Sequence, residues 1–287
     1  MAKKPRKNQK NRVPFSVRRN MAKKGLLPSD CPADVRWLLA ANPNASSTFQ
    51  RELDEADDMR VEFVRCATDF FKATETDNLE NVLEVVLQAQ KAAPQLPEGY
   101  VNCKEGCAFC CHMRVEIVPA ELILIYKSLE HGLSKVEFEN LAKDVAEMCE
   151  QGKPMETAWW FDTQAPCPLL ILDEKACAIY EIRPLSCRAF TSFDASICEA
   201  TYQDGEAREV PRSSTAMIFC DGLSMALTTA YEGQGLEGYR VEMVTGLNML
   251  FKDPGLIDRW LQGEKVFAAA VPADTRVRED FLRRMNV

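Results

Sequence analysis

The sequence predicts a mainly α-helical protein with a few short β-strands, in which helices flank an irregular cysteine-rich core that binds metal. Two observations carry this prediction. Apolar residues recur at helical spacing on both sides of residues 99–205, and four cysteines fall within nine residues inside that segment, Cys103-Lys-Glu-Gly-Cys107-Ala-Phe-Cys110-Cys111. A chain of 287 residues can bury a hydrophobic core, so it does not need cysteines as the covalent staples of a very small domain.

Helices are expected before the cysteine segment. Residues 33–42 resemble a short helix, and residues 48–72 place Phe49, Phe63 and Phe70 on one apolar stripe. A further amphipathic helix is predicted for residues 77–92, and Pro94 and Pro97 end it.

After the clustered cysteines, the pattern alternates between strands and helices. Residues 114–118 alternate as a short strand, and Pro119 opens a helix that runs to about His131. Ser134 and Glu137 form a capping-box pattern at the start of the next helix.

A β-hairpin is expected next, followed by a helical C-terminal region. The hairpin would pair residues 169–172 with residues 176–180, and residues 212–287 return to a helical pattern. The run Gly233-Gln-Gly235-Leu-Glu-Gly238 matches a dinucleotide-binding spacing, but a helical stretch precedes it, so we interpret it as a loop.

These patterns divide the chain into four parts. Residues 1–28 are a basic tail expected to be disordered, and residues 29–98 an N-terminal helical segment. Residues 99–205 are the cysteine-cluster metal-binding domain, and residues 206–287 a C-terminal helical segment. The alternative, that residues 29–287 form one globular unit, stays open.

Charge is distributed unevenly. Residues 1–24 hold ten Lys or Arg and no acidic residue, which leaves 25 basic and 43 acidic residues in the rest of the chain. Such a basic arm is able to contact RNA or DNA, although only Phe15 accompanies it as an aromatic platform. A solvated tail without a partner is the simpler interpretation.

The sequence contains no apolar run long enough to cross a membrane, and its first residues lack the apolar region of a secretory signal. We therefore expect a cytoplasmic protein without a membrane partner. Because thiols stay reduced there, twelve cysteines indicate metal binding or redox chemistry rather than a disulfide framework.

Eight cysteines are the predicted metal ligands. Thiolates crowded together repel one another unless a soft cation neutralises them, and zinc and iron are the metals that suit sulfur ligands. Four thiolates complete one tetrahedral site, so eight suffice for two sites or one polynuclear site. The predicted ligands are Cys103, Cys107, Cys110, Cys111, Cys167, Cys177, Cys187 and Cys198.

The remaining cysteines and the histidines are weaker candidates. Cys220 is an alternative to Cys198 as the eighth ligand, whereas Cys31, Cys66 and Cys149 are expected to have core or incidental roles. Of the two histidines, His112 is a candidate ligand or a nearby support, and His131 a helix-end residue.

Local sequence also suggests how the ligands are arranged. Neighbouring Cys110 and Cys111 are expected to point in different directions, as successive side chains do, and so to bind different metal atoms or to divide into one ligand and one packing residue. Because clustered thiolates carry excess negative charge, nearby cations are expected to support them. Those cations are Lys104, Arg114, Arg183 and Arg188.

The cysteine segment resembles a known family. The residues that carry the likeness are Cys103-x3-Cys107-x2-Cys110-Cys111, Cys167-Pro-Leu-Leu, Cys177-Ala-Ile-Tyr and Arg183-Pro-x2-Cys187-Arg188. Together they resemble the YkgJ-type cysteine-cluster family, a CxxCxxCC domain described as zinc- or iron-chelating with eight characteristic cysteines. The likeness spans roughly residues 100–200 and implies metal chelation without a defined reaction.

Three functions remain open from the sequence. The first is a zinc- or iron-binding protein, structural or a metal carrier, in which an iron–sulfur cluster is one form of the metal. The second is an iron–sulfur enzyme of redox or methyl-transfer type, and a related cysteine cluster in flagellin lysine N-methylases supports the methyl-transfer form. The third is a metal-stapled protein that contacts nucleic acid through its basic tail.

Overall fold

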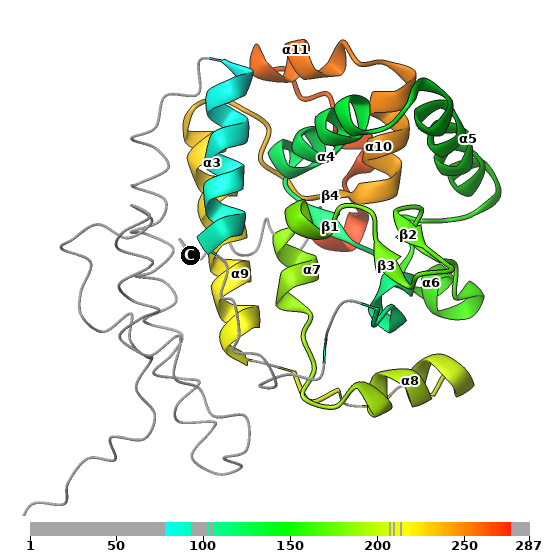
Figure 1. The fold of residues 1–287 in the computed structure, drawn as a ribbon. Helices are drawn as coiled ribbons and strands as arrows, with labels where there is room; N and C mark the ends of the chain where they lie inside the picture. Colours follow the sequence, from blue (N-terminus) through cyan, green and yellow to red (C-terminus); the bar gives the residue numbers. More distant parts are fainter. Residues whose placement is uncertain are drawn as a thin grey trace, which may run out of the picture.

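A pair of long helices forms one side of the molecule. The structure, a computed structural model, describes residues 78–92, 103, 106–206, 208, 210–212 and 214–276. Helix α3 (Leu79–Ala92) matches the predicted amphipathic helix and buries Val82, Val86 and Ala89. It lies beside α9 (Ser214–Gly233), whose Tyr231 hydroxyl donates to the carbonyl oxygen of Val82 at 3.2 Å (Figure 1).

The centre of the fold is α4 (Pro119–Gly132), which begins with the predicted proline. It packs against α3 and against α10 (Met243–Lys252), while α5 (Lys135–Gln151) packs on α10 from the other side (Figure 1). The predicted capping box at the start of α5 is present, because Ser134 and Glu137 bond each other's main-chain N–H groups. Helix α11 (Leu256–Leu261) and the 3-10 turn η5 (Ala268–Ala270) follow α10.

The strands are short and antiparallel. Strand β1 (Glu116–Ile117) pairs with β4 (Val241–Glu242), and β2 (Leu170–Ile171) pairs with β3 (Ala176–Cys177). Strands β1, β2 and β3 are each shorter than the sequence pattern predicts, and β4 lies in the region 212–287, for which only helices were expected. Strand β1 ends because α4 starts two residues later, and the second hairpin arm turns into the 3-10 helix η4 (Tyr180–Ile182). The mainly helical fold class with a few short strands is confirmed.

One cluster of buried apolar residues joins these elements. It takes side chains from α3, α4, α9 and α10, and its largest fully buried members include Trp160, Trp260, Tyr126 and Tyr231. All three predicted segments after the tail therefore contribute to a common core within the described residues. The predicted domain boundaries themselves stay a prediction.

Short elements surround the cysteines at the other end of the core. They are η3 (Phe109–His112), α6 (Thr157–Thr163), α7 (Leu185–Ala189) and α8 (Ala195–Asp204) (Figure 1). The helices predicted for residues 33–42 and 48–72, and the basic tail, lie outside the described residues. Within the described ranges, every helix is too short or too polar to span a bilayer.

Candidate metal centre

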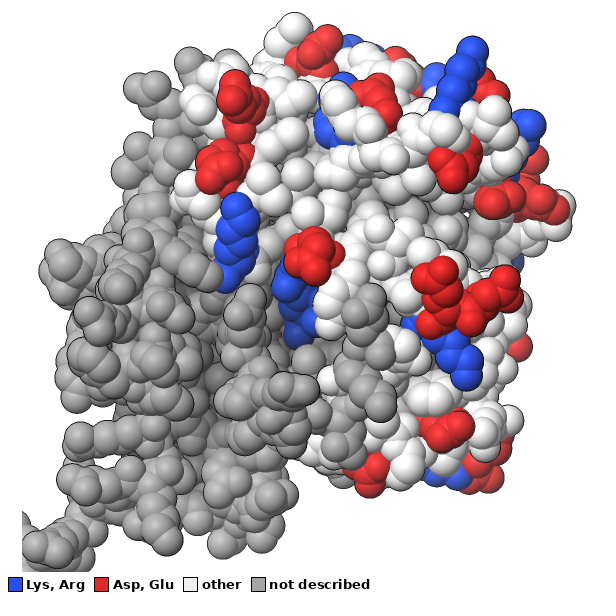
Figure 2. Space-filling view, viewed as in Figure 1, with Lys and Arg blue, Asp and Glu red and all other residues white. Residues whose placement is uncertain are grey.

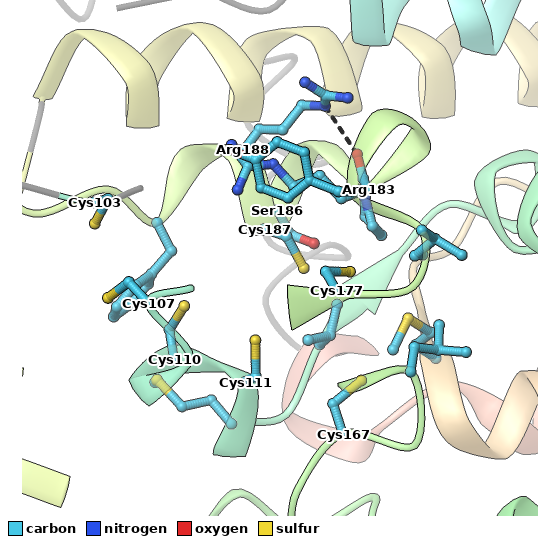
Figure 3. A pocket seen from close by; sticks show the side chains of 18 of the residues that line it. Cys103, Cys107, Cys110, Cys111, Cys167, Cys177, Arg183, Ser186, Cys187 and Arg188 are labelled. Carbon is cyan, nitrogen blue, oxygen red and sulfur yellow. Dashed lines mark hydrogen bonds between the residues drawn. The ribbon is translucent and has the colours of Figure 1, made fainter. Parts of the chain in front are cut away.

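Seven of the eight predicted ligands surround one pocket. The cavity has a volume of about 480 Å³, and its walls come from η3, the β2–β3 hairpin, α7 and the loops between them. Figure 3 shows the sulfur atoms around this space. The seven lining cysteines are Cys103, Cys107, Cys110, Cys111, Cys167, Cys177 and Cys187.

The 3-10 helix η3 places two adjacent cysteines on the same side. Cys110 and Cys111 both point into the pocket (Figure 3), and the nearby Cys111 thiol raises the pKa of Cys110. The prediction that they point in different directions is wrong. Successive side chains are opposed in a strand, but they are about 120° apart in a 3-10 helix, so adjacent thiols can face one cavity.

Helix α8 holds η3 in place through one aromatic side chain. The Tyr202 ring lies 4.6 Å from the His112 ring and 6.0 Å from the Phe109 ring, measured between centroids. The ring nitrogens of His112 contact the Ala108 carbonyl oxygen at 3.2 Å and the Tyr202 hydroxyl at 3.4 Å. His112 is thus engaged in packing η3, and it is not among the residues that line the pocket.

The β2–β3 hairpin carries two more thiols to the pocket. The main-chain N–H of Cys167 donates to the Cys111 carbonyl oxygen at 2.7 Å, which ties the start of the hairpin to η3. Cys177 lies in β3 opposite Leu170. Hairpin pairing therefore determines the separation of Cys167 and Cys177.

Cys187 is positioned by a buried carboxylate. Glu121 of α4, which is 1% exposed, accepts the first N–H of α7, that of Leu185, at 2.8 Å. The same oxygen accepts from the Gln90 side chain of α3 at 3.2 Å. Glu121 therefore anchors α7, and with it Cys187, to the helical core.

Cys103 has the electrostatic character of a metal ligand. A hydrogen bond from Cys107, together with the Ser192 N–H at 3.0 Å and the charge of Arg183, lowers the pKa of Cys103 to about 6, although partial burial opposes this. The thiolate is the form that binds metal, so these contacts favour the ligand state of Cys103.

The deeper thiols are held in their neutral form. Burial raises the pKa of Cys167 and Cys187, and neighbouring cysteines raise both further. The hydrogen bond that the protonated Cys110 thiol donates to Cys111, and then burial, raise the pKa of Cys110. Because a metal ligand must lose its proton, a soft cation would displace protons from these thiols.

The thiols are gathered but are not yet in coordinating positions. Among the described residues, no three Cys, His, Asp or Glu side chains lie close enough together to hold one ion. All seven lining thiols nevertheless face a common space, and thiolate sulfur suits zinc and iron. The donor set therefore fits such a metal, and coordination requires the thiols to move inward.

The predicted supporting cations have different roles. Arg114 lines the pocket but pairs with Glu116 and Asp274, each at 2.6 Å. Arg188 donates to the carbonyl oxygens of Arg183 at 2.9 Å and Glu181 at 2.5 Å. Lys104 lies outside the described residues.

Arg183 is the cation that faces the thiols. Its charge lowers the pKa of Cys103, after the hydrogen bond from Cys107, and it opposes the effect of burial on the pKa of Cys177. Its guanidinium carbon lies 4.5 Å from the centre of the Tyr180 ring.

The other cysteines differ from the seven in their surroundings. Cys198 is not among the pocket-lining residues, and its sulfur lies 3.9 Å from the Asp194 carbonyl oxygen of the same helix. The Cys198 thiol contacts the side chain of Ser192, and the main-chain N–H of Ser192 donates to the Cys103 sulfur. Cys198 therefore lies next to the end of the pocket that Cys103 lines. Cys220 is 1% exposed in the hydrophobic core, and Cys149 packs against that core. Cys31 and Cys66 lie outside the described residues.

Comparison with known proteins agrees with the site. A family model with the description "CxxCxxCC: Putative zinc- or iron-chelating domain" matches part of the chain. Residues 102–210 match this domain. The CxxCxxCC match contains all eight predicted ligands, supports metal binding and confirms the resemblance seen in the sequence. Neither the curated proteins nor the solved structures give a significant match.

Sequence reasoning missed the residues that position the thiols. Glu121 and Ser192 act through contacts 64 and 89 residues away along the chain. A glutamate inside an otherwise apolar helical run, Ala120-Glu121-Leu122-Ile123, was the available signal for Glu121. Ser192 acts through its main chain, for which the sequence carries no signal.

Proposed function

We propose that the CxxCxxCC segment chelates zinc or iron through the seven pocket-lining thiols, with Cys198 as the eighth ligand. The observation that carries this proposal is the convergence of thiols from η3, the hairpin, α7 and two loops on one cavity. Bound zinc would staple these short elements together, whereas bound iron would supply redox chemistry. The ten described cysteines are all free thiols, which supports location in a reducing compartment such as the cytoplasm.

The thiols that influence one another's pKa fall into two groups of proposed ligands. Cys103 and Cys107 are hydrogen-bonded to each other, and Cys198 lies near Cys103. At the other end, beyond the effect of burial, Cys187 raises the pKa of Cys167, and Cys177 raises the pKa of both. The adjacent thiols of Cys110 and Cys111 lie between the groups (Figure 3). Eight thiolates divided in this way suffice for two tetrahedral metals or one polynuclear centre.

The test is metal analysis combined with an absorption spectrum of anaerobically purified protein. We expect bound zinc or iron, and a colourless zinc sample is distinguished from a coloured iron–sulfide one by its spectrum. Cys177→Ser and Cys187→Ser should lower the metal content, because each removes one soft ligand. Cys149→Ser is the matched control, since Cys149 packs against the core and does not line the pocket.

Two results would contradict the proposal. One is wild-type protein that binds neither zinc nor iron under anaerobic conditions. The other is equal metal content in Cys177→Ser, Cys187→Ser and Cys149→Ser. Comparing Cys198→Ser with Cys220→Ser decides the eighth ligand, and we expect only the first to reduce metal content.

The iron–sulfur enzyme and nucleic-acid alternatives gain no specific support from the described residues. The basic segment 1–24 lies outside them. On the face shown in Figure 2, acidic and basic side chains are interspersed and do not gather by sign. Salt-dependent RNA or DNA binding that disappears on deleting residues 1–24 would favour the third function.

A further inference from the structure

The pocket is much larger than a metal ion needs. Its volume of about 480 Å³ compares with roughly 10–15 Å³ for one water molecule by a similar measure. It falls within the range of roughly 300–1,000 Å³ that is usual for small-molecule sites. The space therefore has room for a second occupant beside the metal.

One part of the wall carries polar atoms without partners. Among the described residues, the buried Arg183 Nε, Ser186 Oγ and Thr191 Oγ1 have no hydrogen-bond partner, and all three residues line this pocket. Thr191 is 9% exposed, and the Ser186 hydroxyl lies beside Cys187 (Figure 3). A buried polar group without a hydrogen-bond partner is destabilising, so three in one wall point to a ligand that they bind.

Arg183 also lacks an acidic partner. Among the described residues its guanidinium makes no hydrogen bond or ion pair, and its guanidinium carbon lies over the Tyr180 ring, 4.5 Å from the ring centre. Arg114 in the same pocket pairs with two carboxylates, and Arg188 donates to two carbonyl oxygens. The charge of Arg183 instead acts on thiols, and the pKa of Cys103 is lowered to about 6. The position of Arg183 therefore favours negative charge, from a thiolate or from an added anion.

We propose that the pocket binds a small oxyanion-bearing molecule, a carboxylate or a phosphate, through Arg183, Ser186 and Thr191. The guanidinium matches a planar or tetrahedral oxyanion in charge and geometry, and the two hydroxyls donate to its remaining oxygens. Because Ser186 precedes Cys187, the anion lies next to a proposed metal ligand. This proposal rests on the proposed metal-binding function in one respect, which is that the anion and the metal occupy the same pocket.

A competing use of the same donors is hydrogen bonding to the metal-bound thiolates. In that arrangement Arg183 and Ser186 would stabilise the sulfur ligands, and no external anion would be needed. The two arrangements differ in what is lost when Arg183 is replaced. Replacing Arg183 should lower the affinity for the anion if the donors bind an anion, and the affinity for the metal if they bond to the thiolates.

The experiment is calorimetric titration of inorganic phosphate and acetate into zinc-loaded and metal-free protein, after the zinc content has been measured. We expect at least one probe to bind the wild type. Arg183→Gln, and Ser186→Ala combined with Thr191→Val, should each weaken it about tenfold or more at unchanged zinc content. Arg259→Gln is the control, because Arg259 lies on α11 with an exposed side chain.

A second measurement locates the anion. With cobalt(II) in place of zinc, the phosphorus resonance of bound phosphate should be broadened by the paramagnetic ion, and Arg183→Gln should remove this broadening. For acetate, the methyl proton resonance reports the same effect.

Three results would overturn the anion site. In the first, neither probe binds the wild type at about 10 mM. In the second, the probe affinity is unchanged in both variants. In the third, Arg183→Gln loses zinc but keeps its probe affinity. Protein that holds no metal, yet binds a probe in a manner dependent on Arg183, would reject the metal function alone. The two proposals can therefore fail separately.

Discussion

Arg183 and Arg188 are five residues apart, yet they contact different groups. Arg188 is directed to the carbonyl oxygens of Glu181 and Arg183, and so it closes the turn that leads into α7. Pro184 restricts the backbone between them. Arg188 thus determines where Arg183 and Cys187 lie, without itself needing to touch the metal.

Replacing Arg188 should therefore weaken metal retention. We expect Arg188→Ala to lower metal affinity by roughly ten- to a hundredfold, as is usual when a residue that orients a ligand is lost. Competition with a chelator measures the change, and Arg259→Ala serves as the control. Equal metal affinity in the two variants would show that Arg188 is a structural contact without influence on the centre.

Glu242 is a buried carboxylate between the core and the pocket. It is 0% exposed and accepts the N–H groups of Val244 and Thr245 at 3.0 and 2.7 Å, which caps α10. Burial raises its pKa from 4.5 to about 7, against the effect of these hydrogen bonds. The folded protein therefore keeps a proton that the unfolded chain releases.

This shift predicts a pH-dependent contribution to stability. Because the folded pKa lies above the unfolded one, the contribution of Glu242 is complete below about pH 4.5 and is lost as pH rises through 7. Glu242→Gln does not titrate, so the wild type should lose about 2–3 kcal/mol relative to the variant between these limits. Urea unfolding of both metal-loaded proteins across this range measures it. A constant difference would contradict the prediction.

At the scale of elements, the close approach of α4 and α10 depends on one glycine. A Cβ atom built on Gly246 of α10 would lie 2.6 Å from the Leu122 Cδ2 atom of α4. Leu122 is 0% exposed and has little room to move. The absence of a side chain at Gly246 therefore permits this helix pair to pack closely.

Adding a methyl group at this contact should destabilise the fold. We expect Gly246→Ala to lower the free energy of unfolding by about 1–3 kcal/mol through overpacking. Gly132→Ala is the matched control, because nothing lies within 4 Å of its added Cβ atom. That variant should be neutral or more stable, by at most about 1 kcal/mol. Similar thermal unfolding of the two variants would show that Leu122 yields without cost.

At the scale of the molecule, the helical core and the cysteine-lined end depend on different interactions. Helices α4, α9 and α10 are held by a common apolar cluster. In contrast, η3 and the two strands of the β2–β3 hairpin are short elements gathered around thiols, whereas α7 also packs against α9 and buries Leu185 in the core. Elements of this length are only marginally stable by themselves, so bound metal should contribute much of their order.

Removing the metal should loosen one end of the molecule only. After chelation we expect faster hydrogen exchange in η3 and the β2–β3 hairpin, while α3, α4, α9 and α10 remain protected. Mass spectrometry of peptides from both parts measures this. Equal protection before and after complete metal removal would show that the cysteine-lined end is folded without metal.

The sequence by itself determined the elements whose signals are local. Apolar spacing located α3, a proline and a capping box located the starts of α4 and α5, and the hairpin arms were found around residues 173–175. The cysteine spacing identified the metal-binding segment. Each of these signals arises from residues within one or two turns of one another, which is why sequence alone carries them.

Only the tertiary structure decided how the cysteines meet. It brought Cys103 to Ser192 and anchored the N–H of Leu185 on Glu121, and it turned Cys110 and Cys111 to the same side. It also separated the roles of Arg183 and Arg188, and placed Cys198 behind the pocket wall. These outcomes depend on contacts between distant segments and on the type of helix formed by η3. Neither is encoded by the local spacing of residues.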